Sequence, residues 1–207
     1  MADQETVSER FSDEDATPAR KRPRPGERRL QILQTLASML EQPGAERVTT
    51  ASLAAKIGVS EAALYRHFAS KAQMFEGLID FVDQSVIGLI RQVTDREAAG
   101  PVQASRIVAL LLQFAEKNPG MSRVMIGDAL VLEHERLQER INLLFDKIEA
   151  QLRQSLKTSD SPTPTADAQV AASLLVAFMQ GRLQRFARSG FKRLPSEHLQ
   201  AALTKML

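Results

Sequence analysis

Apolar side chains recur at intervals of three and four residues along most of the chain after Glu27. This spacing places them on one face of an α-helix, whereas a half-buried strand would alternate apolar and polar residues. The sequence contains no sustained alternation of that kind and no Asn-Gly or Asp-Gly hairpin signal. We therefore predict an all-α fold of eight or nine helices.

Residues that start or stop helices divide this pattern into segments. The first predicted helix begins at Glu27 and ends at Pro43-Gly44. Its apolar face comprises Leu30, Leu33, Leu36, Ala37 and Leu40. Short helices are expected from Thr50 and from Ser60, and Ser70 caps a longer one. Further helices are expected over 102–117, after Pro119-Gly120, near 128–156, over 167–188 and over 196–206.

Composition excludes several classes of function. The chain has no cysteine, which excludes disulfides, thiolate zinc sites and cysteine nucleophiles. Its three histidines leave little for a metal site. We expect no metal and no cofactor. The sequence contains no run of 18 apolar residues, so we predict no membrane span. The N-terminus lacks the apolar core of a secretory signal, so a cytoplasmic protein is expected. No nucleophile has a base at a recognised spacing, so we predict that the protein is not an enzyme.

The segment 50–68, TASLAAKIGVSEAALYRHF, is typical of a helix-turn-helix. Gly58 supplies the positive φ that ends the first helix, and Ser60 caps the second. Leu64 and Phe68 anchor the second helix to the core and leave its other face free. A second helix of this kind enters the major groove of DNA. A plain helical hairpin is the alternative reading of the same pattern.

Side chains around this second helix are candidates for contacts to double-stranded DNA. Hydroxyls at helix N-termini, Tyr65, His67 and nearby cations suit phosphate oxygens, and Arg66 suits either a guanine edge or a phosphate. Ala62 and Ala63 are small enough to let the helix approach base edges. A place at the edge of the core is the alternative for His67. The predicted DNA-binding residues are Thr49, Thr50, Ser60, Glu61, Ala62, Ala63, Tyr65, Arg66, His67, Lys71 and Arg28.

The charge of the chain changes sign within its first 29 residues. The first fifteen residues are acidic, and six cations follow between Arg20 and Arg29. A segment so polar buries too little apolar surface to order itself. We predict a disordered tail with a basic arm over 1–26, a DNA-binding domain over 27–71, and a helical dimerisation and partner-binding domain over 72–207. A tail that binds nothing is the alternative.

The run LYRHFASK (64–71) within VTTASLAAKIGVSEAALYRHFASKAQMFEGLI resembles the TetR family of bacterial regulators. In that family the run ends the recognition helix and begins the fourth helix. The segments FAEKNPG (114–120), RLQERINLLFDKIEAQLRQSL (136–156) and FARSGFKRLP (186–195) are similar to a nucleoid occlusion branch of the family. The resemblance covers residues 27–207. It implies dimers that bind chromosomal DNA and then antagonise assembly of the tubulin-like division protein FtsZ, which blocks septum formation over the nucleoid.

The same resemblance implies a groove in the second domain that holds the FtsZ C-terminal tail. The matching positions are Phe81, Leu110, Lys117 and Asn118, with Arg91 as a nearby cation. Two positions depart from the branch, because Gln113 stands where glycine is expected and Leu89 where arginine is expected. From the residues alone, Lys117 at a helix end offsets the helix dipole, and Phe81 and Leu110 fit a core.

Two later helices carry apolar stripes of the coiled-coil kind that favour a homodimer. The stripe over 136–156 comprises Leu137, Ile141, Leu144, Ile148 and Leu152. The stripe over 167–188 comprises Val170, Leu174, Ala177, Phe178 and Phe186. Two such helices from each protomer form a four-helix bundle about a two-fold axis. Such a dimer separates its recognition helices by ~34 Å and reads a palindromic site. Packing within one chain is the alternative.

A ligand-responsive repressor of the TetR type is the alternative function. It requires a cavity in the second domain with convergent polar groups. The predicted interior is aliphatic with phenylalanine and holds no cluster of His, Asp or Arg, so we expect that no small-molecule ligand is required.

Overall fold

The computed structural model describes residues 26–42, 48–157 and 164–207. Within these ranges the chain forms nine α-helices and one short 3₁₀ helix and no strand, so the all-α prediction is confirmed. The predicted tail over 1–26 lies outside the described residues apart from Gly26. The elements are α1 (Glu27–Leu40), α2 (Thr50–Ile57), α3 (Glu61–Tyr65), α4 (Lys71–Thr94), α5 (Pro101–Lys117), α6 (Pro119–Met125), η2 (Asp128–Leu130), α7 (Glu135–Leu156), α8 (Pro164–Arg188) and α9 (Leu199–Met206).

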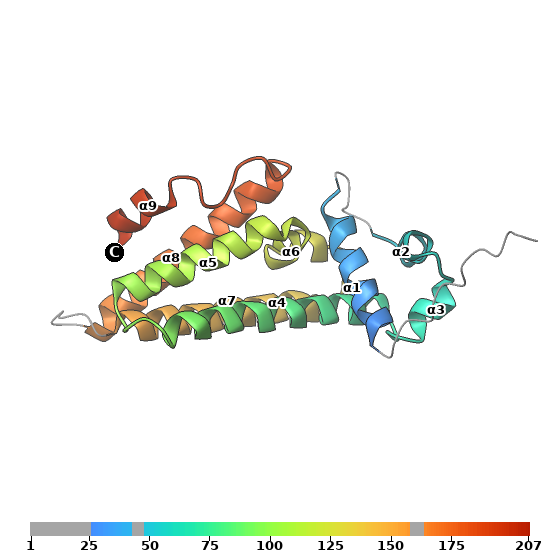
Figure 1. Cartoon of the computed structure of the whole chain (residues 1–207), viewed down its shortest axis with the longest axis horizontal. Coiled ribbons are helices and arrows are strands. Elements are labelled where there is room, and N and C mark those ends of the chain that lie inside the picture. The colour runs from blue at the N-terminus through green and yellow to red at the C-terminus, as the bar shows by residue number, and fades with distance from the viewer. Residues whose placement is uncertain (1–25, 43–47, 158–163) are drawn as a thin grey trace, which may run out of the picture.

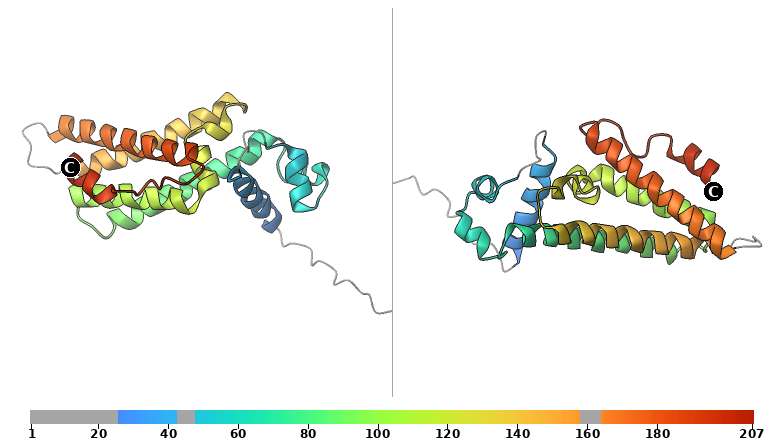
Figure 2. Two further views of the ribbon diagram at one scale, coloured as in Figure 1. Left: turned by 90° about the horizontal axis from the view of Figure 1, so that it is seen from above. Right: turned by 180° about the vertical axis from the view of Figure 1, so that it is seen from behind.

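The helices form an elongated molecule with two parts. Figure 1 shows α1, α2 and α3 gathered at one end, while α5, α7, α8 and α9 occupy the other part. Helix α4 belongs to both, because it begins beside α3 and then runs along α7 and α5. Its 24 residues span about 36 Å at 1.5 Å per residue. The views in Figure 2 show the same separation of the small helical unit from the long helices.

The buried face of α1 is rotated from the face that the sequence predicts. Leu36, Ala37 and Leu40 are buried as expected, but Ile32 is buried as well and Leu30 is 47% exposed. Leu30 lies at the edge of α1 beside Phe81 and Met121, where it lines a shallow apolar hollow. The predicted apolar face of α1 is therefore buried only in part, because α1 packs against α2, α4 and α6 rather than against one partner.

The segment predicted as one long helix near 128–156 is broken. Gly127 adopts a left-handed φ of 77°, η2 follows, and α7 begins only at Glu135. The Nδ1 atom of His134 accepts a hydrogen bond from the Arg136 backbone N–H at 3.3 Å and so caps α7. The break turns the chain from α6 into the long α7–α8 hairpin.

The apolar stripe of α7 is core of a single chain. Its five predicted residues, Leu137, Ile141, Leu144, Ile148 and Leu152, are all at most 1% exposed. Their prediction as dimer contacts was wrong, because α8, α4 and α5 of the same chain cover them. On α8, Phe186 is also buried, whereas Val170 and Leu174 are exposed. An apolar stripe therefore does remain uncovered, but it lies on α8.

Four ion pairs join α4 to α7 and the loop before it. Three acidic residues of α4 face three basic residues of α7: Glu76 pairs with Arg136 (2.7 Å), Asp83 with Lys147 (2.8 Å), and Asp80 with Arg140. At the first turn of α4 the signs are reversed, and Lys71 pairs with Glu133. We call these four pairs the α4–α7 ion-pair row. All are partly exposed, so each contributes at most about 1 kcal/mol.

Two glycines allow the helices to approach closely where the two parts of the molecule meet. A Cβ on Gly120 of α6 would lie 2.0 Å from the carbonyl oxygen of Ala37 in α1. A Cβ on Gly77 of α4 would lie 3.2 Å from Leu33 and from Phe68. The junction is therefore tightly packed. None of the helices in the described ranges combines the length and apolar character needed to cross a bilayer.

Candidate nucleic-acid interface

Helix α2 is fixed at both ends by local hydrogen bonds. The Thr49 hydroxyl accepts from the Ser52 N–H at 3.1 Å, and the Ser52 hydroxyl accepts from the Thr49 N–H at 3.1 Å, which forms a capping box. Gly58 ends the helix with φ 76° and donates to the Ala54 carbonyl at 2.9 Å. The glycine turn predicted from the sequence is confirmed.

Helix α3 is short, and one face of it is buried. The Ser60 hydroxyl accepts from the Ala63 N–H at 3.2 Å and caps the helix. Leu64 and Phe68 are buried, as expected for the anchoring residues. Ala63 is half-buried, whereas Ala62 is exposed. Ser60, just before the helix, is exposed as well. The helix therefore lies on the protein surface with its outer face accessible to a partner.

Three side chains at the end of this helix project from the molecule. Tyr65 is 44% exposed, and Arg66 and His67 are exposed as well. The alternative that His67 lies at the edge of the core was therefore wrong. Its backbone carbonyl accepts a hydrogen bond from Arg29 at 2.8 Å, and the Arg29 guanidinium lies 4.0 Å from the Phe68 ring centroid. These contacts hold α1 against the exposed end of α3.

Besides Thr49 and Ser60, whose hydroxyls cap helices, four of the predicted DNA-binding side chains have partners in the chain. The Thr50 hydroxyl donates to the Glu61 carboxylate at 2.6 Å. Glu61 is exposed, as expected for the free face of the helix, but its carboxylate already has a partner. Arg28 donates to the Gln31 side chain at 2.7 Å. The Lys71 ammonium forms an ion pair with Glu133, a residue that sequence reasoning did not bring near the interface.

The pair Lys71–Glu133 has a consequence for the interface. Lys71 can neutralise a phosphate only if that phosphate competes with the Glu133 carboxylate. Among the predicted DNA-binding cations, Arg66 is exposed at the end of α3, whereas Arg28 contacts Gln31 and Lys71 contacts Glu133.

The predicted partner groove lies along α4 and α5. Phe81 is 41% exposed and Leu110 is half-buried, so neither is fully enclosed in the core. Lys117 is exposed at the end of α5. The Asn118 side chain donates to the Phe114 carbonyl at 2.7 Å, which terminates α5. Arg91 is exposed but lies ten residues along α4 from Phe81, about 15 Å away.

A small helical unit with an exposed third helix, joined by a shared long helix to a larger helical domain, defines a DNA-binding regulator of the TetR class. Residues 32–78 match the family described as bacterial regulatory proteins, tetR family. Residues 100–206 match a family described as tetracyclin repressor-like, C-terminal domain. The predicted domain boundary after Lys71 falls at the first residue of α4. The match to the tetR family extends seven residues beyond it, to residue 78.

Solved structures share the fold at low sequence identity. The fatty acid degradation regulator FadR from Bacillus halodurans has a TM-score of 0.74 at 14% identity, over 89% of this chain and 97% of that one. The TetR family regulator PfmR from Thermus thermophilus has a TM-score of 0.66 at 18% identity, over 86% of this chain and 94% of that one. At these identities the likeness is one of fold.

Curated relatives are much more similar. The nucleoid occlusion factor SlmA of Idiomarina loihiensis is 49% identical over 177 residues, which cover 84% of this chain and 90% of the relative. SlmA of Shewanella oneidensis is 50% identical over 174 residues, which cover 83% and 88%. The chain belongs to the SlmA family of nucleoid occlusion factors.

Proposed function

We propose that this chain is a nucleoid occlusion factor that binds chromosomal DNA as a homodimer and, while bound, antagonises FtsZ assembly. The observation that carries the proposal is the identity of about half of the residues to SlmA proteins over most of both chains. The factor would act at the nucleoid in the cytoplasm. Its chemistry is that of recognition, since no step of it calls for catalysis, a metal or a cofactor.

The exposed face of α3 supports the DNA-binding part of the proposal. Ala62 carries no long side chain, so the helix can approach base edges in a major groove. Tyr65, Arg66 and His67 project from the end of the helix and can donate hydrogen bonds to phosphates. Thr49 and Ser60 remain predicted contacts at the helix N-termini. Lys71 joins them if its pair with Glu133 opens.

The uncovered face of α8 supports dimerisation. Val170 and Leu174 are exposed and follow each other at one helical turn, with the exposed Ala177 next. Leu143 of α7 is also exposed, and α7 packs alongside α8. Burying a leucine of this kind against a second copy stabilises the dimer by about 1.5–3 kcal/mol. A two-fold axis at this face gives the paired α3 helices a palindromic DNA site.

The surface around Phe81, Leu110 and Lys117 supports the FtsZ part of the proposal. Accessible apolar side chains and an exposed cation on neighbouring helices suit a peptide with an apolar anchor and a carboxylate. Phe81 also lines the hollow that Leu30 of α1 closes. The proposed groove therefore begins at the junction between the two parts of the molecule.

The test is an FtsZ polymerisation assay with and without a duplex that carries the binding site. The expected result is that the chain reduces polymer formation strongly only when the duplex is present. Lys117→Glu should abolish that effect and leave DNA binding unchanged, because it reverses one charge in the groove. Lys157→Glu, at an exposed lysine after α7, is the matched control and should behave as the unaltered chain.

Two outcomes would contradict the proposal. The first is inhibition of FtsZ that does not depend on DNA or does not occur at all. The second is an equal effect of the two lysine substitutions, which would show that the groove is elsewhere. Loss of DNA binding in Lys117→Glu would instead indicate a disturbed fold.

A hollow between α7 and α8 favours a ligand-responsive repressor as the second candidate. Amide side chains of Gln138, Asn142, Gln180 and Gln184 converge there beside Met125 and Phe145. Convergent polar groups over an apolar floor are typical of small-molecule sites. This candidate predicts that a small molecule releases the chain from DNA, whereas the nucleoid occlusion candidate predicts that DNA strengthens binding to an FtsZ tail peptide.

A further inference from the structure

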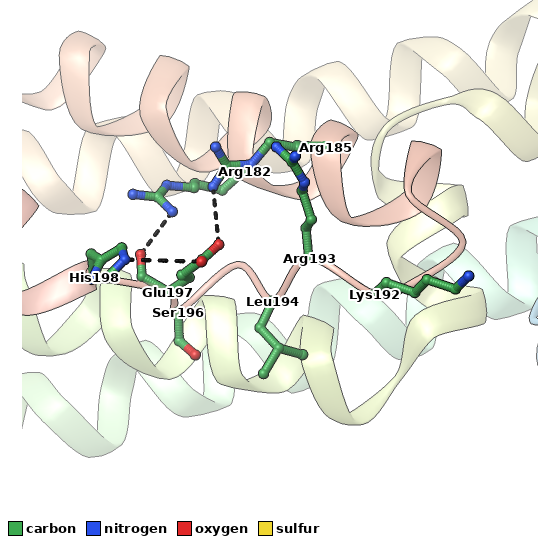
Figure 3. A pocket seen from close by; sticks show the side chains of 8 residues that line it. All are labelled: Arg182, Arg185, Lys192, Arg193, Leu194, Ser196, Glu197 and His198. Atoms are coloured by element: carbon green, nitrogen blue, oxygen red, sulfur yellow. Dashed lines mark hydrogen bonds and ion pairs between the residues drawn. The ribbon is translucent and has the colours of Figure 1, made fainter.

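A second charged feature lies away from α3, where the chain turns from α8 back to α9. Figure 3 shows basic side chains from the last turns of α8 and from the following loop around an open hollow of about 620 Å³. We call it the basic pocket. Its charged and titratable residues are Arg182, Arg185, Lys192, Arg193, Glu197 and His198.

Positive charge in the basic pocket exceeds negative charge. Four of the side chains are cations and one, Glu197, is a carboxylate. The carboxylate lies 3.8 Å from Arg185 and 3.9 Å from His198, so neither contact is a close ion pair. Arg182 donates to the backbone carbonyl of Glu197 at 2.8 Å. Most of the cationic charge is therefore left for a ligand.

The two arginines on α8 repel each other. They are three residues apart, which places them one turn apart on the same helix face. Burial, and then the neighbouring charge of Arg185, hold the pKa of Arg182 below its ordinary value. A bound anion relieves this repulsion, because it places negative charge between two like charges.

The loop that forms the other wall is strained and firmly held. Phe191 (φ 64°) and His198 (φ 54°) bracket it, and they are the only non-glycine residues with positive φ among the described residues. Such conformations cost about 1–3 kcal/mol and persist where surrounding contacts impose them. The wall thus has one fixed shape before any ligand binds.

Contacts to α5 and to the end of α8 impose that shape. The Ser189 hydroxyl accepts from the backbone N–H groups of Lys192 (3.2 Å) and Arg193 (2.9 Å). The Ser196 N–H donates to the Glu116 carboxylate of α5 at 2.7 Å. Phe191 packs edge-on against Phe186 with ring centroids 5.1 Å apart. A pocket formed in advance loses little entropy when it binds.

We propose that the basic pocket binds a ligand that carries two or more phosphate groups. Guanidinium groups match phosphate oxygens with paired, charge-assisted hydrogen bonds, and three of the four cations are arginines. The hollow has the size of a small-molecule site, and it has cations on both walls, so a ligand with more than one phosphate can meet a cation on each. The phosphates can belong to a free compound or to a nucleic-acid backbone. This site is separate from α3 and does not depend on the function proposed above.

The test is calorimetric titration of the full chain with inorganic tripolyphosphate. The altered chain carries Arg185→Gln and Arg193→Gln, one change on each wall. The matched control carries Arg96→Gln and Lys157→Gln, which remove the same charge at exposed positions outside the pocket. We expect the first pair to raise the Kd about tenfold or more through the lost charge-assisted hydrogen bonds, and the control pair to change it less than about twofold. Unchanged thermal melting shows that both chains fold.

Two further arms separate the sources and the chemistry. In the first arm, tripolyphosphate is titrated into protein that is already saturated with duplex DNA. An unchanged affinity for tripolyphosphate indicates a free phosphate compound as the ligand, because DNA then leaves the pocket open. Loss of that affinity indicates that the nucleic-acid backbone occupies the pocket. A peptide of residues 1–17, with six acidic and one basic side chains, supplies comparable charge without phosphate. Equal or tighter binding of that peptide, equal effects of the two charge-removing pairs, or no binding of tripolyphosphate would overturn the proposal.

Discussion

Replacing Gly120 with alanine tests the packing of the two parts of the molecule. The new Cβ would lie 2.0 Å from the Ala37 carbonyl oxygen and 3.2 Å from Cγ of Glu41. The Glu41 side chain can move, but the Ala37 oxygen belongs to the backbone of α1. To reach even 3.0 Å, α1 and α6 must separate locally by about 1 Å, which opens the junction around it.

The expected loss of stability follows from two opposing effects. Overpacking of this kind costs about 1–3 kcal/mol, and a backbone contact places Gly120→Ala at the upper end. Alanine regains about 0.5–1 kcal/mol because it restricts the unfolded chain and favours the helix. The net loss is about 2 kcal/mol. At ~2–4 °C per kcal/mol for a chain of this size, Tm should fall by about 4–8 °C.

Thermal unfolding followed by circular dichroism at one protein concentration measures this shift. Gly88→Ala is the matched control, because nothing lies within 4 Å of a Cβ at Gly88 in α4. Only the helix-favouring effect then operates, and Tm should rise by about 1–4 °C. A Tm for Gly120→Ala equal to or above that of Gly88→Ala would refute the close approach of α6 to α1.

Three other perturbations test the interface, the dimer and the tail. Glu133→Gln frees the Lys71 ammonium for phosphate, so duplex affinity in a gel-shift titration should rise about fivefold, and weaker binding would contradict a phosphate role for Lys71. Leu174→Asp places a charge on the exposed α8 stripe and should yield monomers in light scattering, with helical content retained; a persistent dimer would locate the interface elsewhere. Removal of residues 1–26 should make the fall of log affinity with log salt less steep, by about 0.9 for each arm cation that contacts a phosphate. An identical slope would show that the tail does not contact DNA.

Local signals in the sequence predicted the helices and the turn, because each depends on neighbouring residues. Thr49, Gly58, Ser60 and Ser70 start or stop helices at the positions expected, since caps act within one turn. The anchoring residue Leu64 followed from helical spacing in the same way.

What the sequence left undetermined depends on contacts between distant segments. Periodicity shows that a helix face is apolar but not which neighbour covers it. The α7 stripe therefore looked like a dimer contact although α8 of the same chain buries it. The apolar face predicted for α1 likewise included the exposed Leu30 but not the buried Ile32. The same limit applies to charges, because Lys71 and Glu133 are 62 residues apart.

The basic pocket was missed for a related reason. Its arginines look like separate solvated charges along α8 and the segment after it. They converge only because the loop doubles back and is held by Glu116, which lies 80 residues from Ser196. The chain reverses at Phe191 and His198, two non-glycine residues with left-handed backbone. The sequence did not predict this conformation, because it is uncommon for residues other than glycine. The segment 186–195 indicated which family the chain resembles, but it did not predict that the loop folds back to form a pocket.

The α4–α7 ion-pair row restricts sliding of the two helices past each other. Both helices run in the same direction through the row, and its first pair has the opposite polarity to the rest. A shift of α4 by one turn, about 5.4 Å, toward the start of α7 would bring Glu76 toward Glu133 and set carboxylate against carboxylate. One alignment is therefore favoured over its neighbours, although each pair adds little to stability. A displacement of the start of α4 along its axis that keeps these pairs intact therefore moves α7 with it.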